Sequence, residues 1–211
     1  WTEVADVNLA REAAAGTGSS NTNALMSAGE TATPTRIANT ESWNGTSWTE
    51  LNDLNVARSV IGGSGSNSAT IAMGGYSNPA AAYVASSEEW TANAPVGAWS
   101  TGTSMNTGKD RTAGAGIYTA ALSFGGGTST TPSATAINEL WNGSTWTETT
   151  DMNSAKNKHA GFGLSTAAIA CGGEISGSKS GATETWNGSS WSEGNDMNTV
   201  REQHAAASGI T

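Results

Sequence analysis

The stretch that decides the fold is residues 156–191, which read KNKHAGFGLSTAAIACGGEISGSKSGATETWNGSSW. It starts with a base, passes through small residues and a short apolar run that ends in a glycine pair, and closes with Glu184, Trp186 and Trp191. The same order recurs along the chain of 211 residues. Self-similarity at a period of about 20 to 50 residues is the signature of repeat architectures, so this stretch is one copy of a structural unit.

The tryptophans mark the period of the repeat. Units of 45 to 51 residues follow one another, and 21 residues remain from the last starting tryptophan onward. The starting residues are Trp1, Trp48, Trp99, Trp146 and Trp191. The other four stand shortly before the next unit: Trp43, Trp90, Trp141 and Trp186. All nine tryptophans thus belong to one pattern.

Polar residues keep the same register. An asparagine stands seven residues after each starting tryptophan, a base ten residues after it, and a glutamate two residues before the second tryptophan of each full unit. The bases are Arg11, Arg58, Lys109, Lys156 and Arg201, and the glutamates are Glu41, Glu88, Glu139 and Glu184. Because every unit carries both, we interpret them as structural ion pairs or hydrogen-bond clamps, and not as catalytic acid-base partners.

Each unit predicts four short strands. The base and the small residues form the first strand, the apolar run the second, the Glu-x-Trp segment the third, and the next starting tryptophan the fourth. Asn44-Gly45, Asn142-Gly143 and Asn187-Gly188 lie between third and fourth strands and favour hairpin turns with positive φ at both positions. Tandem four-stranded antiparallel units are typical of propeller blades, whose innermost strands converge and need small residues.

Composition narrows the range of partners. The 27 glycines and 13% charged residues suit short strands and tight turns. The net charge of −9, with only nine scattered Lys and Arg, would repel a phosphate backbone, so we expect no nucleic-acid partner. No apolar run approaches the ~20 residues that span a bilayer, so we expect no membrane insertion.

The unit resembles the kelch repeat, which also builds the propeller of galactose oxidase. The shared order is a base, a small or aromatic strand, a double glycine such as Gly172-Gly173, an aromatic residue and then tryptophan. Kelch repeats usually carry Tyr at the second tryptophan and Pro-Arg where this chain has Ala-Arg or Ala-Lys. The Trp-Asn-Gly-x-Ser-Trp version is similar to divergent kelch-like arrays of phage and environmental bacterial proteins. The resemblance implies an all-β fold, a β-propeller of four-stranded antiparallel blades.

We expect a single propeller domain or propeller fragment over residues 1–211. Its blades would cover about residues 5–52, 53–103, 104–150 and 151–195, with a partial fifth at 196–211 that includes a strand at 1–4. Kelch propellers close with about five to eight blades. The chain is therefore a piece of a longer array, a small ring of four or five blades, or a ring completed between molecules; we favour the first two. Unpaired edges of an open ring would invite self-association.

The resemblance to galactose oxidase raises the possibility of copper chemistry, which needs a Tyr cross-linked to Cys and further Tyr and His ligands. The available residues are Cys171, Tyr76, Tyr83, Tyr118, His159 and His204. Both histidines occupy the same repeat position, and two histidines fall short of the three or four ligands of a metal site. We interpret Cys171 as a buried structural thiol. We expect no catalytic residues, no metal and no cofactor, and therefore no enzyme.

The loops between second and third strands are the longest and least alike, and specificity is usually placed in such loops. They emerge on the same face of the disc as the connections between units. Aromatic and cationic side chains there have the greatest potential for recognition. The candidate ligand-binding residues are Arg36, Tyr76, Asn78, Tyr83 and Lys179.

Our leading hypothesis is a non-enzymatic binding or adhesion module, extracellular or virion-associated, that recognises a glycan or a protein surface. A second hypothesis is a structural subunit of a fibre or filament, such as a tail fibre, assembled through its incomplete blade. A galactose oxidase-like enzyme is disfavoured by the ligand count.

Overall fold

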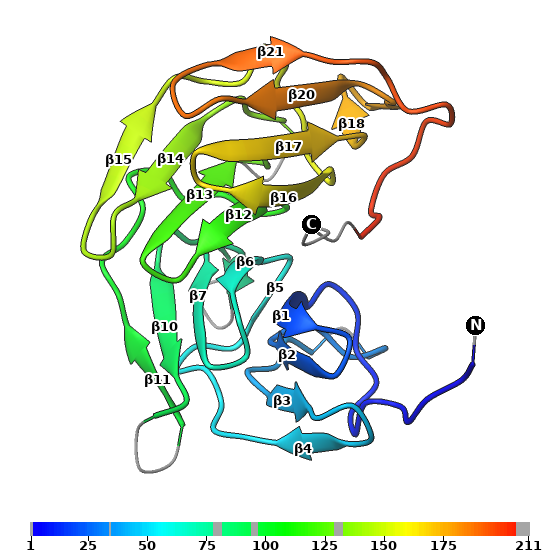
Figure 1. The fold of residues 1–211 in the computed structure, drawn as a ribbon, viewed down its shortest axis with the longest axis vertical. Coiled ribbons are helices and arrows are strands. Elements are labelled where there is room, and N and C mark those ends of the chain that lie inside the picture. The colour runs from blue at the N-terminus through cyan, green and yellow to red at the C-terminus, as the bar shows by residue number, and fades with distance from the viewer. Residues whose placement is uncertain (1, 34, 78–81, 94–96, 129–132, 206–211) are drawn as a thin grey trace.

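The computed structural model describes residues 2–33, 35–77, 82–93, 97–128 and 133–205. These residues form strands and turns only, so this part of the chain contains no helix that could cross a membrane. Four four-stranded antiparallel sheets follow one another along the chain and lie around a common centre like the blades of a propeller (Figure 1). We call them sheets 1 to 4.

The strands of each sheet run from the centre outward in chain order. Sheet 1 contains β1 (Ala15–Ser20), β2 (Asn23–Ser27), β3 (Thr40–Trp43) and β4 (Trp48–Glu50). Sheet 2 contains β6 (Gly62–Gly65), β7 (Ala69–Met73), β10 (Ser87–Thr91) and β11 (Ala98–Thr101). Sheet 3 contains β12 (Ala113–Ile117), β13 (Ala120–Phe124), β14 (Asn138–Trp141) and β15 (Trp146–Thr149). Sheet 4 contains β16 (Ala160–Leu164), β17 (Ala167–Cys171), β20 (Thr183–Trp186) and β21 (Trp191–Glu193).

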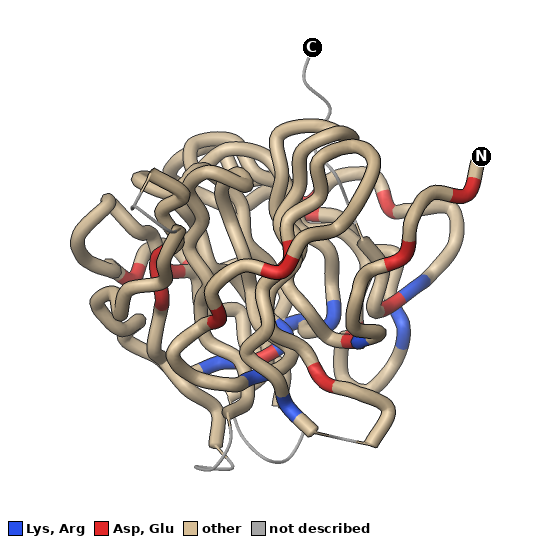
Figure 2. Tube along the Cα trace, turned by 90° about the horizontal axis from the view of Figure 1, so that it is seen from below, with Lys and Arg blue, Asp and Glu red and all other residues tan. Residues whose placement is uncertain are grey.

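Two small ribbons lie in the connections. One contains β5 (Arg58–Ser59), β8 (Tyr76–Ser77) and β9 (Ala82–Tyr83), and it joins the connection before sheet 2 to the loop between the second and third strands of that sheet. The other contains β18 (Glu174–Ile175) and β19 (Ser178–Lys179), which both lie in the loop between the second and third strands of sheet 4. Single bridges make the corresponding contact elsewhere, as between Asp110 and Gly127. The residues that follow each base therefore lie beside the loop between second and third strands, on what we call the loop face. Seen from the edge of the disc, Lys and Arg gather in one half of its thickness (Figure 2).

Neighbouring sheets pack face to face in one repeated way. Leu25 of β2 lies in one core cluster with Trp90 and Trp99 of sheet 2, so the aliphatic face of one sheet covers the tryptophan face of the next. The other two junctions repeat this arrangement with Ile71 and Met73 against Trp141 and Trp146, and with Leu122 and Phe124 against Trp186 and Trp191. Burial of these apolar faces is the main force that holds adjacent sheets together.

The two tryptophans of each sheet lie opposite each other on the third and fourth strands. Their ring centroids are 5.4 to 5.7 Å apart, with the rings tilted. The indole of the first tryptophan also reaches the turn between the first and second strands, where Trp43 donates its Nε1–H to the carbonyl of Asn21 at 3.0 Å. Each tryptophan pair thus ties three strands of its own sheet while presenting a broad apolar surface to the preceding sheet.

The innermost strands carry small side chains because neighbouring sheets approach each other closely there. A Cβ added to Gly114 would lie 2.6 Å from the carbonyl oxygen of Gly63 in sheet 2. A Cβ on Gly161 would lie 2.5 Å from the ring of Phe124 in sheet 3. The corresponding Gly16 of sheet 1 has nothing within 4 Å of such a Cβ.

The ring of sheets is open. The first strands β1, β6, β12 and β16 lie side by side in that order, and a gap separates sheet 4 from sheet 1 (Figure 1). The expected strand at 1–4 and the expected first strand of a fifth blade are not formed by residues 2–7 or 196–205; residues 1 and 206–211 lie outside the described residues. A single strand with no neighbour cannot satisfy its backbone groups, which explains why these segments are irregular.

The Asn-Gly turns differ from the expected two-residue hairpins. Trp43 pairs directly with Trp48, so the loop has four residues. The side chain of Asn44 accepts hydrogen bonds from the N–H groups of Thr46 and Ser47, both at 2.9 Å. Gly45 alone of the Asn-Gly pair has positive φ, at 92°. Asparagine therefore acts here as a side-chain cap of the turn, and only glycine supplies the left-handed backbone.

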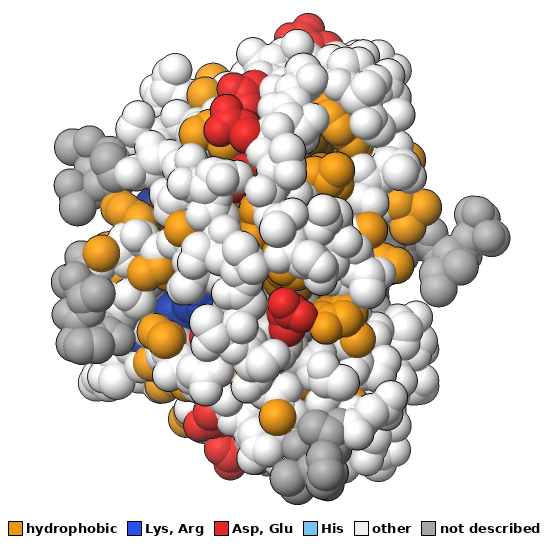
Figure 3. All heavy atoms as spheres, turned by 90° about the vertical axis from the view of Figure 1, so that its left-hand side faces the viewer, with side chains coloured by type: hydrophobic (Ala, Val, Ile, Leu, Met, Phe, Trp, Pro, Cys, Tyr) orange, Lys and Arg blue, Asp and Glu red, His pale blue; other side chains and the backbone are white. Residues whose placement is uncertain are grey.

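The outer edge of sheets 2 and 3 is mostly uncharged and polar (Figure 3). Hydrophobic side chains are scattered over it singly or in small groups. Scattered apolar side chains are normal on protein surfaces, so this edge gives no sign of a binding site.

Candidate functional site

Glutamate, base and asparagine of each repeat meet in a buried clamp. The Nη2 atom of Arg58 lies 2.6 Å from Oε1 of Glu88, and the backbone N–H of Asn55 donates to Oε2 of the same carboxylate at 2.7 Å. The other ion pairs join Arg11 to Glu41, Lys109 to Glu139 at 3.5 Å, and Lys156 to Glu184 at 3.0 Å. All eight charged side chains are at most 2% exposed, so they are closed to any substrate.

The charges of the clamps are buried and paired, as expected for structural ion pairs. Burial lowers the pKa of Lys109 to about 8, and the charge of Glu139 opposes that shift. A buried charge is tolerated only when it is paired and hydrogen-bonded, which the asparagine N–H helps to achieve. The sequence pattern suggested the base and the glutamate as partners, but it did not reveal that asparagine completes the clamp.

A second repeated feature is a row of residues with left-handed backbone on the loop face. The residue two positions after each base has a left-handed backbone, with φ between 49° and 55°: Ala13, Val60, Arg111, Lys158 and Gln203. From Val60 onward each of these residues donates its N–H to the carbonyl of the preceding one, at 2.8 to 3.3 Å. A β-branched residue such as Val60 rarely adopts this conformation. The hydrogen-bond ladder holds it there, beside the pocket described next.

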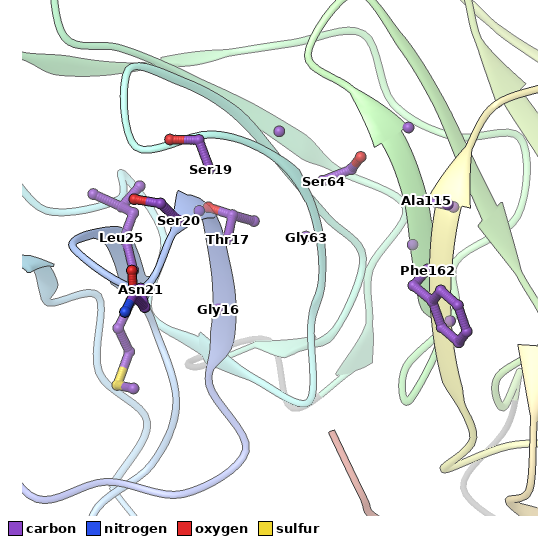
Figure 4. A pocket seen from close by; sticks show the side chains of 18 of the residues that line it. Gly16, Thr17, Ser19, Ser20, Asn21, Leu25, Gly63, Ser64, Ala115 and Phe162 are labelled. Atoms are coloured by element: carbon purple, nitrogen blue, oxygen red, sulfur yellow. The ribbon is translucent and has the colours of Figure 1, made fainter. Parts of the chain in front are cut away.

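Two of the cavities among the described residues are large enough to hold a small ligand. The larger one, of ≈650 Å³, lies at the centre and is lined by the first strands of all four sheets (Figure 4). Its lining is mainly glycine, serine and alanine, and the larger side chains that line it are Thr17, Asn21, Leu25, Met26, Trp48 and Phe162. No charged residue is among the described residues that line it. This cavity therefore has room for a ligand but, among the described residues, no charged group to bind one.

The smaller cavity, of ≈310 Å³, is the better candidate site. We call it the loop-face pocket. The side chains that give it its chemistry are Glu30, Arg36, Tyr76, Tyr83, Asp110 and Arg111. They come from the connections of sheets 1, 2 and 3, so the pocket exists only because three successive repeats are packed together.

The aromatic part of the pocket is built on the ribbon β5–β8–β9. Tyr76 and Tyr83 face each other across β8 and β9, with ring centroids 5.2 Å apart and an edge-to-face angle of 74°. The guanidinium of Arg36 lies 4.3 Å from the ring centre of Tyr76, within cation–π distance. Three side chains from two neighbouring loops thus form a rigid platform with aromatic and cationic surface.

Glu30 and Asp110 are the acidic residues that line the pocket, and Asp110 is 1% exposed. The Oδ2 atom of Asp110 lies 3.0 Å from Nη1 of Arg111. The Oδ1 atom of Asp110 has no hydrogen-bond donor among the residues that the structure describes. Burial raises the pKa of Asp110 to about 6, and the charge of Arg111 opposes this shift only in part. Near neutral pH the pocket therefore holds carboxylate and guanidinium groups side by side.

The structure brings together three of the five candidate residues, Arg36, Tyr76 and Tyr83. Lys179 lies away from them, 61% exposed and 3.7 Å from Glu202. Asn78 lies outside the described residues. The sequence did not single out Glu30, Asp110 and Arg111. Asp110 and Arg111 directly follow the repeated base Lys109, in a region that the repeat pattern marks as scaffold.

The residues considered for copper chemistry do not gather at one place. The Sγ atom of Cys171 lies 3.8 Å from Nε2 of His204, whereas Tyr76 and Tyr83 line the loop-face pocket. No group of three or more His, Cys, Asp or Glu suited to a metal occurs among the described residues. Cys171 is half-buried and not buried as expected, because no following sheet covers this face of sheet 4. Partial burial raises the pKa of its thiol.

A scan of protein-family models found none that matches this chain, and a search of curated proteins found no match either.

Proposed function

We propose that the protein is a divergent kelch-like propeller array that acts as a binding module, extracellular or virion-associated, and recognises a glycan through the loop-face pocket. The observation that carries the proposal is the platform of Arg36, Tyr76 and Tyr83 beside the buried carboxylate of Asp110. Aromatic faces pack against sugar rings, and charged groups form strong hydrogen bonds with hydroxyls.

The size and position of the pocket support this proposal. Ligand pockets typically measure about 300 to 1,000 Å³, so ≈310 Å³ suits one small group such as a single sugar ring. The pocket also lies on the variable connections of a fixed scaffold, where binding sites commonly occur. The kelch-like character rests on the repeated base, double glycine and tryptophan of the sequence.

A glycan array followed by calorimetry with the best hit tests the proposal. We expect Arg36→Gln and Tyr83→Ala each to weaken binding roughly tenfold or more, because each removes one part of the platform. Lys179→Gln is the matched control, since it removes an exposed cation away from the pocket. No saturable binding to any glycan, or equal losses for Arg36→Gln and Lys179→Gln, would contradict the proposal.

A second candidate function is a structural subunit of a fibre, because the open ring leaves one face of sheet 1 and one face of sheet 4 uncovered. Sedimentation velocity over a range of protein concentrations tests it. Association that disappears when residues 197–211 are deleted would favour the fibre subunit. A monomer at every concentration would leave the binding module as the proposed function.

A further inference from the structure

Sheets 1 and 4 each leave uncovered a face that is covered in sheets 2 and 3. On sheet 1, Met26 and Trp48 are partly exposed, whereas the residues in the same positions of sheet 2, Ala72 and Trp99, are 0% and 7% exposed. On sheet 4, Ile169 and Cys171 are partly exposed, whereas their equivalents in sheet 3, Leu122 and Phe124, are completely buried. Sheet 1 thus offers the tryptophan side of a sheet junction and sheet 4 the aliphatic side. We call the space between them the open junction.

The segment that follows sheet 4 is already docked as every earlier connection is. Met197 donates its N–H to the carbonyl of Gly181, and Gly173 donates to the carbonyl of Arg201, both at 2.8 Å. The same two bonds appear one repeat earlier, from Met152 to Ala136 at 3.0 Å and from Gly126 to Lys156 at 2.9 Å. The backbone of Arg201 therefore occupies the position from which the other repeated bases reach their glutamate.

The side chain of Arg201 nevertheless lacks that glutamate. Arg201 is exposed, and within the described part of the chain its Nε–H donates to the backbone carbonyl of Thr199, at 3.4 Å. Asn198, the clamp asparagine of this repeat, is exposed too, and no carboxylate of the described residues pairs with either side chain. The four other bases have at most 1% of their side chain exposed. Two of the three members of a clamp are thus in place beside the open junction.

We infer that the open junction binds a β-hairpin from a further repeat of the same type, whose third strand carries Glu two residues before Trp. The glutamate would pair with Arg201 and accept the N–H of Asn198. The tryptophan would pack on Ile169 and Cys171, and the opposite face of the hairpin would cover Met26 and Trp48. This inference is independent of the ligand of the loop-face pocket.

An intact second copy of the chain does not fit this site. Its four clamp glutamates are each buried and already paired with a base of their own sheet. To offer one of them, the second copy would have to unfold a sheet. The occupant is instead a segment whose glutamate has no base of its own, equivalent to residues 167–190 of this chain, which carry Glu184 and Trp186.

The first test adds a copy of residues 167–190 after Thr211. We expect the extended chain to unfold at higher urea concentration. Arg201→Gln should lower the midpoint of the extended chain but leave the original chain unchanged, because Arg201 is exposed there. The matched control is an extension that carries glutamine at the position of its clamp glutamate, which should make Arg201→Gln neutral again. If Arg201→Gln has the same effect with and without the extension, the inference is wrong.

The second test uses a fluorescein-labelled peptide of residues 167–190, with Cys171→Ser, added to the original chain. We expect saturable binding at one peptide per protein, weakened roughly tenfold or more by Arg201→Gln in the protein or Glu184→Gln in the peptide. The two changes together should cost no more than one alone, because they remove the same interaction. Additive losses, or self-association of the original chain that depends on Arg201, would overturn the inference.

Discussion

At the scale of single residues, the clamp glutamate is the residue whose replacement should destabilise the fold most. Glu139 is completely buried, lies 3.5 Å from the Nζ atom of Lys109 and accepts the N–H of Asn106 at 2.7 Å. Its carboxylate neutralises a buried charge and joins the connection before the sheet to the third strand. Such a group contributes little net stability over an apolar core, but removing one partner leaves the other charge buried and unpaired.

We therefore expect Glu139→Gln to lower the free energy of unfolding by about 3 to 5 kcal/mol, measured by urea denaturation. The double variant Glu139→Gln with Lys109→Met should recover part of the loss, because it also removes the buried cation. The control is Glu148→Gln, which changes an exposed carboxylate on the neighbouring strand and should stay within about 0.5 kcal/mol of wild type. An unchanged midpoint for Glu139→Gln would exclude the clamp as a structural element.

His159 makes stability depend on pH. It is buried beside Phe124, and burial, followed by the charge of Lys156, lowers its pKa to about 3. Between pH 6.5 and 3 the unfolded chain therefore binds a proton that the folded chain does not. The free energy of unfolding should fall as pH drops through this range, by up to about 1.4 kcal/mol per pH unit.

The variant His159→Thr, which copies Thr112 at the same position of sheet 3, isolates this effect. Its unfolding free energy should depend less steeply on pH than that of wild type between pH 6 and 4. Asp110 acts in the opposite direction, because its raised pKa of about 6 makes the folded chain bind the extra proton as pH falls below 6. Asp110 is the same in both proteins, so the difference between the two curves reports His159. Parallel curves would contradict the assignment.

At the scale of elements, the innermost strands show how sheet packing restricts the sequence. Their glycines stand where the neighbouring backbone leaves no room for a Cβ, as at Gly114. The same strand position in sheet 1, Gly16, is open because no sheet precedes it. Glycine is therefore required at one position and only tolerated at the other.

Alanine substitution distinguishes the two positions. Gly114→Ala should lower the melting temperature by several degrees, because its methyl group would push sheet 3 away from sheet 2. Gly16→Ala should leave the melting temperature unchanged or raise it slightly, because alanine reduces the freedom of the unfolded chain. Thermal unfolding followed by circular dichroism measures both. Equal destabilisation by the two changes would show that sheet 1 is covered in solution.

The sequence predicted the main strands because tryptophans, glutamates and double glycines repeat at fixed distances. The ribbons β5–β8–β9 and β18–β19 could not be predicted, since strands of two residues have no periodicity. In addition, β5 pairs with β8 only because two connections are brought together. The Asn-Gly turns were assigned the wrong geometry because asparagine stabilises turns by two mechanisms, positive φ and side-chain capping. Asn44 uses the second.

At the scale of the whole molecule, the sequence predicted the order of the sheets but not how the ring ends. Closure depends on the angle between neighbouring sheets, which no residue pattern reports directly. The loop-face pocket shows the same limit. Variable loops pointed to Arg36, Tyr76 and Tyr83, whereas Asp110 reaches the pocket only because sheet 3 packs beside sheet 2, and its neighbour Lys109 marks it as scaffold.

The open arrangement predicts a gradient of local stability. In arrays where each unit contacts only its neighbours, the terminal units lose half of their stabilising interfaces. Hydrogen exchange should therefore be faster in β2 and β17, the second strands of sheets 1 and 4, than in β7 and β13 of sheets 2 and 3. Uniform protection of all four strands would mean that the uncovered faces are buried in solution.

The hydrogen-bond ladder on the loop face runs in one direction only, from Gln203 back to Ala13. The exposed faces of sheets 1 and 4 also differ, so the array of sheets has a direction and its two ends are not equivalent. A contact between the sheet 4 face of one molecule and the sheet 1 face of another joins two different surfaces, so it is heterologous. An assembly built from such contacts either closes into a ring or grows without limit in one dimension.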